Sequence, residues 1–141
     1  MISMSTTSPR GVSQVRTTER WLAVLALLVT GGIHLALVPE HFEEATYAGW
    51  LFLVDGLAAL ALAAVLLVSD RRWVWVASGL VAGATVAAYV LSRTAGLPQL
   101  GDDVGSWTDP LSFPALAAEV TVVVVAISRL SGSASRRSRG R

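Results

Sequence analysis

Ionisable side chains that could do chemistry interrupt apolar stretches of this sequence. The segment 33–55, IHLALVPEHFEEATYAGWLFLVD, contains both histidines of the chain, His34 and His41, and also Asp55. Glu119 is the one acid of a later apolar stretch. Carboxylates and imidazoles can bind cations or move protons, and such groups inside a membrane indicate a functional site by default.

A polar cluster is expected from the depth and direction of these side chains. The rise per residue of a helix places His34 roughly 6 Å inside the end of its apolar segment. Asp55 and Glu119 lie roughly 13 Å inside the ends of theirs. Arg93 lies at the end of a further apolar segment. Helical side chains lean toward the helix N-terminus, so His34 and Arg93 lean toward the two acids on oppositely directed segments. A lone buried carboxylate costs about 2.5–3.5 kcal/mol on insertion scales. We therefore expect Arg93 to pair with Asp55 or Glu119, and His34 to complete the cluster. The alternative is that the cluster only fixes helix register.

A metal site is a second hypothesis. His41-x-x-Glu44 would place an imidazole and a carboxylate one turn apart if that segment is helical. With His34 and Glu40, it would offer nitrogen and oxygen ligands to Zn²⁺, Cu²⁺ or Fe²⁺. Pro39 predicts a break between the two histidines, which argues against a shared helix face. The alternative is an ordinary acidic loop at the membrane surface. A b-type haem is excluded, since only His34 lies inside a predicted span.

Enzymatic activity has weaker support. The sequence has no G-x-S-x-G, no H-E-x-x-H and no glycine-rich phosphate loop. Asp55 and Glu119 could act as a paired-carboxylate acid and base, as in membrane-embedded aspartyl hydrolases. Nothing beyond the pair supports that chemistry, so a non-enzymatic role is favoured.

The elements that position these residues are predicted to be membrane-spanning helices. The chain is 53% hydrophobic with a mean hydropathy of +0.59, more apolar than a small soluble core could bury. The apolar residues fall in blocks of about twenty, which matches a bilayer core. The prediction is an all-α, up-down-up-down four-helix membrane bundle with spans at 20–38, 46–69, 72–93 and 110–130. Residues 1–19 are expected to be a disordered cytoplasmic tail, and residues 131–141 a basic one.

Arginine positions predict the orientation. All eleven cations are arginine, and all except Arg93 flank the spans on the side of the two termini. The positive-inside rule therefore predicts a multi-pass plasma-membrane protein with both termini in the cytoplasm. A cleaved signal peptide is the alternative reading of the N-terminal region, but the apolar run at 21–38 is longer than a typical signal core.

The amino-acid composition also limits which partners the protein can have. The chain has no cysteine, which excludes disulfides and thiolate metal sites. The bilayer is the main partner, and the arginine-rich C-terminal tail predicts contact with anionic lipid head groups. Nucleic-acid binding is not expected, because no aromatic or folded motif accompanies these arginines. A membrane protein partner is compatible with the small size.

Two segments of the sequence resemble motifs of a known family of membrane proteins. The segments Ile33–Glu44 (IHLALVPEHFEE) and Ser92–Pro98 (SRTAGLP) resemble an IHLxLxPEHxxE-like first loop and an SRTxGLP-like third-span end. Both occur in a family of small, uncharacterised four-span membrane proteins of GC-rich bacteria. The resemblance would cover most of residues 20–130. It implies that the first loop and Arg93 are the parts to test, and it brings no activity with it.

The resulting functional expectation is a small, accessory integral membrane protein with an outward-facing polar site. That site would bind a metal cation or a small polar ligand, or relay protons. The first alternative is a structural or assembly subunit whose cluster only locks the bundle. The second is a membrane-embedded hydrolase. The expected site residues are His34, Glu40, His41, Glu44, Asp55, Arg93 and Glu119.

Overall fold

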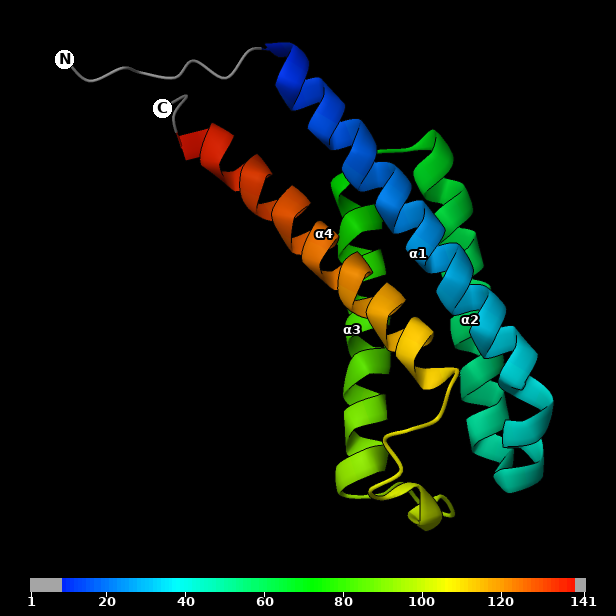
Figure 1. Cartoon of the computed structure of the whole chain (residues 1–141). Helices are drawn as coiled ribbons and strands as arrows, with labels where there is room; N and C mark the ends of the chain where they lie inside the picture. The colour runs from blue at the N-terminus through cyan, green and yellow to red at the C-terminus, as the bar shows by residue number, and fades with distance from the viewer. Residues whose placement is uncertain (1–8, 139–141) are drawn as a thin grey trace.

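The computed structural model describes residues 9–138, which form an all-α four-helix bundle without strands (Figure 1). Residues 1–8 and 139–141 lie outside this description, as do the side chains of 9–12 and 133–138. The predicted up-down-up-down fold is confirmed. Its elements are α1 (Pro9–Glu44), α2 (Thr46–Val68), α3 (Arg72–Thr94), the 3₁₀ helix η1 (Gly101–Asp103) and α4 (Ser112–Ser138).

The bundle has two chemically different ends. α1 begins and α4 ends at one end, with the short α2–α3 turn; we call this the terminal end (Figure 1). The connection 95–111 and the α1–α2 break at Ala45 lie at the opposite end, which we call the loop end. Each helix packs on its two neighbours in the order α1, α2, α3, α4, and α2 and α3 pack on each other least.

All four helices are long and apolar enough to cross a membrane. Large apolar side chains on their outer faces are more than half exposed, including Leu25, Leu51, Val54 and Leu80. A soluble bundle would turn such residues inward, whereas lipid tails solvate them. These features are typical of an integral membrane protein.

Helices α2 and α3 lie close to their predicted ranges, but α1 and α4 are longer. The expected disorder of 1–19 is wrong for residues 9–19, which are helical. Here α1 is stabilised by contact with α4, because the Arg129 guanidinium donates to the Arg16 carbonyl at 3.5 Å. The helix α4 continues through residues 131–138, which were expected to be tail.

The predicted break at Pro39 is also wrong, because α1 runs through this proline to Glu44. Proline removes one helical hydrogen bond, and packing beyond it compensates. Phe42 covers Gly49, where an added Cβ would lie 2.3 Å from the Phe42 ring, and Phe42 also meets Trp50 edge-on at 5.5 Å. The chain reverses only at Ala45, a single extended residue with φ −156° and ψ 121°.

The α1–α2 contact depends on two facing glycines. A Cβ on Gly31 would lie 2.8 Å from the Leu60 side chain and 3.0 Å from the Gly56 carbonyl oxygen. A Cβ on Gly56 would lie 2.8 Å from Leu35. Small residues of this kind let helices approach closely in lipid.

The 95–111 connection folds back over the loop end of α2. Leu100 is buried against Ala45 and Ala48. The Tyr47 hydroxyl donates a hydrogen bond of 2.5 Å to the Pro98 carbonyl. At the far side of the connection, Asp109 accepts from the Leu111 N–H at 3.0 Å and thus supports the start of α4.

Candidate functional site

A cavity of about 340 Å³ occupies the loop-end half of the bundle. It is lined by all four helices and by the 95–111 connection, and most of its lining is apolar. The four predicted cluster residues, His34, Asp55, Arg93 and Glu119, all line it.

His34 is at the centre of the polar part of this cavity. The residue is 5% exposed, and its Nδ1 lies 2.9 Å from the Thr30 carbonyl oxygen. A carbonyl can only accept, so Nδ1 carries a proton and donates it. The other ring nitrogen, Nε2, lies 3.6 Å from Asp55 Oδ2 and 3.7 Å from Glu119 Oε1. The histidine therefore bridges two carboxyl groups from two other helices.

This arrangement needs a further proton. Neutral His34 with Nδ1–H would present a lone pair on Nε2 to both carboxyl groups. Two carboxylates and a lone pair facing one another in an apolar cavity repel and are poorly solvated. One proton on Nε2 or on a carboxyl oxygen removes the repulsion. We call these three groups the His34 cluster (His34, Asp55 and Glu119).

Asp55 has one satisfied oxygen and one open oxygen. The Thr85 hydroxyl lies 3.0 Å from Asp55 Oδ1 and also 3.0 Å from the Val81 carbonyl oxygen. A hydroxyl has a single proton, so it serves one acceptor at a time. If Asp55 is protonated, it can donate to Thr85 while Thr85 donates to Val81. Asp55 Oδ2, which faces His34, accepts no hydrogen bond.

Glu119 is the most deeply buried acid of the cluster. It is 2% exposed on α4, and its Oε1 is buried without a hydrogen-bond partner. Buried carboxyl oxygens are normally hydrogen-bonded, because the cost of desolvating them is otherwise uncompensated. An unpartnered oxygen that lines a cavity is a position where a ligand donor or a proton can bind.

Arg93 lines the cavity but does not join the His34 cluster. Its Nη1 pairs with Asp103 Oδ1 at 2.5 Å, and its guanidinium lies 5.2 Å from the centre of the Tyr89 ring. Its carbonyl accepts from the Gly105 N–H at 2.9 Å. The predicted pairing of Arg93 with Asp55 or Glu119 is therefore wrong. The arginine instead fastens the 95–111 connection to the end of α3.

The proposed metal ligands are not brought together. His34 and His41 do share a face of α1, and both rings lie against Phe52, at centroid distances of 4.9 Å and 3.5 Å. His41 lines the cavity, but Glu40 and Glu44 are exposed and do not line it. Across the described part of the chain, no three or more His, Asp or Glu side chains form a group that could hold a metal ion.

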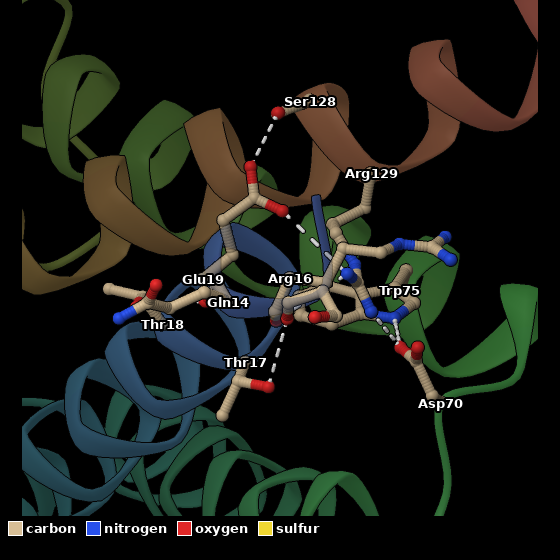
Figure 2. Close-up of polar contacts among 10 residues, drawn as sticks. Gln14, Arg16, Thr17, Thr18, Glu19, Asp70, Trp75, Ser128 and Arg129 are labelled. Atoms are coloured by element: carbon tan, nitrogen blue, oxygen red, sulfur yellow. Dashed lines mark hydrogen bonds and ion pairs between the residues drawn. The ribbon is translucent and has the colours of Figure 1, made fainter. Parts of the chain in front are cut away.

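A second ionic cluster lies at the terminal end (Figure 2). Arg129 of α4 is 5% exposed and pairs with Asp70 in the α2–α3 turn and with Glu19 of α1 at 3.7 Å. Its guanidinium lies 4.7 Å from the centre of the Trp75 ring, and Trp75 Nε1 donates to Asp70 at 2.7 Å. Glu19 also accepts from Ser128 at 2.9 Å. This Arg129 cluster (Arg129, Glu19, Asp70 and Trp75) connects α1, α3, α4 and the turn.

Asp70 of the Arg129 cluster is ionised at neutral pH. Partial burial raises the pKa of Asp70, but hydrogen bonds from Arg129 and Trp75 outweigh it and hold this pKa below the usual 3.8. A lowered pKa means that the contribution of Asp70 to stability is complete above pH 3.8 and is lost as the pH falls through the folded-state pKa.

The Arg129 cluster was not predicted from the sequence, where Arg129 served only as a signal of topology. A usable signal was present. Glu19 and Asp70 are the two acids that flank spans on the arginine-rich side. Acids so placed beside a span-end arginine predict a pairing site.

The fold and the cavity together define a four-helix membrane bundle with a buried carboxyl–histidine cluster. In comparisons with family models, curated proteins and solved structures, nothing matches the chain. The resemblance to small four-span bacterial membrane proteins therefore stays an expectation.

Proposed function

We propose that this protein is a small integral membrane protein that binds a small ligand in its cavity and exchanges a proton through the His34 cluster. The observation that carries the proposal is the pair of buried carboxyl oxygens, Asp55 Oδ2 and Glu119 Oε1, that face one imidazole without hydrogen bonds. A cluster built only to lock the helices would satisfy these oxygens internally.

The proposal includes the orientation of the site. Arg16, Arg20, Arg71 and Arg72 lie at the terminal end, in addition to Arg129. The loop end has a single arginine, Arg93, and it is neutralised by Asp103. By the positive-inside rule, the terminal end lies in the cytoplasm and the cavity is in the outer half of the plasma membrane. In this setting the protein would serve as an accessory to a larger membrane system.

A proton-exchanging ligand site has more support than a metal site. No group of ligating side chains suited to a metal is present in the part of the chain that the structure describes. The cavity instead combines an apolar wall with a small number of converging polar groups, which is typical of sites for organic ligands.

Infrared spectroscopy of the protein in lipid nanodiscs tests the proton exchange. A protonated carboxyl has a C=O stretching band that a carboxylate lacks. We expect a buried carboxyl band that titrates between about pH 4 and pH 10. The band should weaken in Asp55→Asn and in Glu119→Gln. It should persist in Glu43→Gln, which changes an exposed acid outside the cavity.

The opposite result would identify a structural cluster. If no band assigned to Asp55 or Glu119 titrates in that range, the cluster has a fixed protonation state. The proposal of a proton-exchanging site would then fail, and the helix-locking alternative would stand.

A further inference from the structure

The 95–111 connection covers the cavity at the loop end, although its Leu111 lines the cavity and is 42% exposed. At the loop end, Leu100 packs on Ala45 and Ala48, and Tyr47 is hydrogen-bonded to Pro98. The Arg93–Asp103 ion pair fastens the same 95–111 connection to α3. These contacts cover part of the route from the cavity to the surface beyond the loop end.

The side between α2 and α3 is different. Leu51 of α2 and Ala84 and Ala88 of α3 line the cavity, yet all three are exposed on the outer surface of the bundle. An opening of the cavity between these two helices, which are also the neighbouring pair that packs least, accounts for this exposure. The two alanines are small, so no bulky side chain of α3 closes this opening.

The depth of the opening places it in the acyl layer. Leu51 lies about 8 Å, Ala88 about 9 Å and Ala84 about 15 Å along their helices from the loop end. A ligand that uses this opening must dissolve in lipid. A small, strongly hydrated ion does not meet that condition, because it would have to shed its water in the acyl layer.

The polar groups on the inner wall of the cavity determine which ligand head group can bind. Beyond the apolar opening, the cavity ends at Asp55 Oδ2 and Glu119 Oε1, which lack hydrogen-bond donors. Among the described residues that line the cavity, Arg93 is the only arginine; it pairs with Asp103 through Nη1, while its Nε is a buried donor without a partner. The lining has four acids, Asp55, Asp103, Asp109 and Glu119, against this one arginine. The excess of acids favours a ligand that brings N–H donors and a positive charge. It disfavours a fatty acid or a phosphate.

We propose that the ligand is an amphiphilic amine, with a protonated nitrogen at Asp55 and Glu119 and an apolar body directed toward the opening between α2 and α3. The amine enters sideways from the membrane leaflet around the loop end. This inference rests on the proposed function and adds the ligand class and the entry route. The bound ammonium supplies the positive charge that a proton on the His34 cluster supplies in the empty site.

Calorimetric titration of the protein in nanodiscs of zwitterionic lipid tests the ligand class. The probe is dodecylamine, and empty nanodiscs correct for partitioning into lipid. We expect saturable binding of dodecylamine and none of dodecanol or dodecanoate. Glu119→Gln should weaken dodecylamine binding about tenfold to a hundredfold, because it removes a charged acceptor. Equal binding of amine and alcohol, or equal binding by Glu119→Gln, would overturn the proposed class.

A matched pair of variants tests the entry route. Ala88→Trp places a large side chain at the opening, whereas Ala87→Trp adds the same side chain at an exposed alanine that does not line the cavity. Both positions are exposed, so both variants should fold. Ala88→Trp should abolish dodecylamine binding or slow it at least tenfold, and Ala87→Trp should leave it unchanged. Unchanged binding by Ala88→Trp would overturn sideways entry.

Three further outcomes separate the amine proposal from its alternatives. If a second copy of the chain fills the opening, the nanodisc protein will have dimer mass, and Ala88→Trp will return it to monomer; that result would overturn the amine proposal. If the infrared band titrates normally but dodecylamine does not bind, only the ligand class fails. If the band itself is missing, the proposed function fails first.

Discussion

At the scale of single residues, His34 decides whether two acids can share one apolar cavity. Its Nδ1 is committed to the Thr30 carbonyl, which fixes the ring and aims Nε2 at both carboxyl groups. Such an orienting bond is the usual means of setting which nitrogen reacts. The histidine thus lies between Asp55 and Glu119 and contacts both acids.

This coupling predicts a non-additive pair of mutations. His34→Ala should destabilise the bundle by about 3–5 kcal/mol, because it leaves two buried carboxyl groups without their partner. Adding Glu119→Gln should restore part of that loss, since it removes one of the repelling groups. Unfolding in mixed detergent micelles measures all four members of the cycle. Strictly additive losses would show that the histidine does not mediate between the acids.

The polar cluster was partly predictable from sequence, and the reason is geometric. Depth along a helix follows from residue number, so His34, Asp55 and Glu119 could be placed at compatible levels. The partner of Arg93 could not be predicted, because Arg93 lies at a helix end, where its long side chain reaches either inward or outward. The outcome depended on Asp103, whose position is set by the fold of the 95–111 connection.

At the scale of helices, the sequence predicted spans well and breaks poorly. α2 and α3 end where charged residues follow apolar runs, at Asp70 and near Arg93. Pro39 misled the prediction, because local preference for a break is weaker than the packing of Phe42 on Gly49. The start of α1 was missed for a similar reason, since its contact with Arg129 joins residues far apart in the sequence.

Neighbouring glycines on α1 give a controlled test of the α1–α2 contact. Gly31→Ala should destabilise the bundle by about 1–3 kcal/mol, since the new methyl group would overlap Leu60. Gly32→Ala has nothing within 4 Å of its added Cβ and should be neutral or stabilising, because alanine favours helix. The same unfolding assay compares them. Equal effects of both variants would contradict the close packing of the two helices.

At the scale of the whole molecule, the two ends of the bundle carry different kinds of polar cluster. The terminal end has a paired, ionised set around Arg129, which is already satisfied by its neighbours. The loop end has an under-satisfied set around His34 beside a cavity. The first joins the helices, and the second leaves acceptors open. This division separates the part of the molecule that joins the helices from the part that we propose binds a ligand.

The proposed orientation can be measured directly, because the chain has no cysteine. Ser106→Cys places a thiol in the exposed connection at the loop end, and Thr17→Cys places one on the exposed terminal end of α1. A membrane-impermeant maleimide should label Ser106→Cys in intact cells and Thr17→Cys only after lysis. The reverse pattern would place the cavity on the cytoplasmic side and contradict the proposed orientation.

The Arg129 cluster also has a consequence for biosynthesis. Arg129 lies near the end of the last span, and its partners come from the first helix and from the second turn. When α4 leaves the ribosome, Glu19 and Asp70 have already been made and lack the Arg129 guanidinium that pairs with both. Docking of α4 is therefore the step that brings Arg129 to the acids of α1 and of the α2–α3 turn. A chain halted before Arg129 would carry unpaired acids beside its spans, a feature that quality-control proteases of the membrane could recognise.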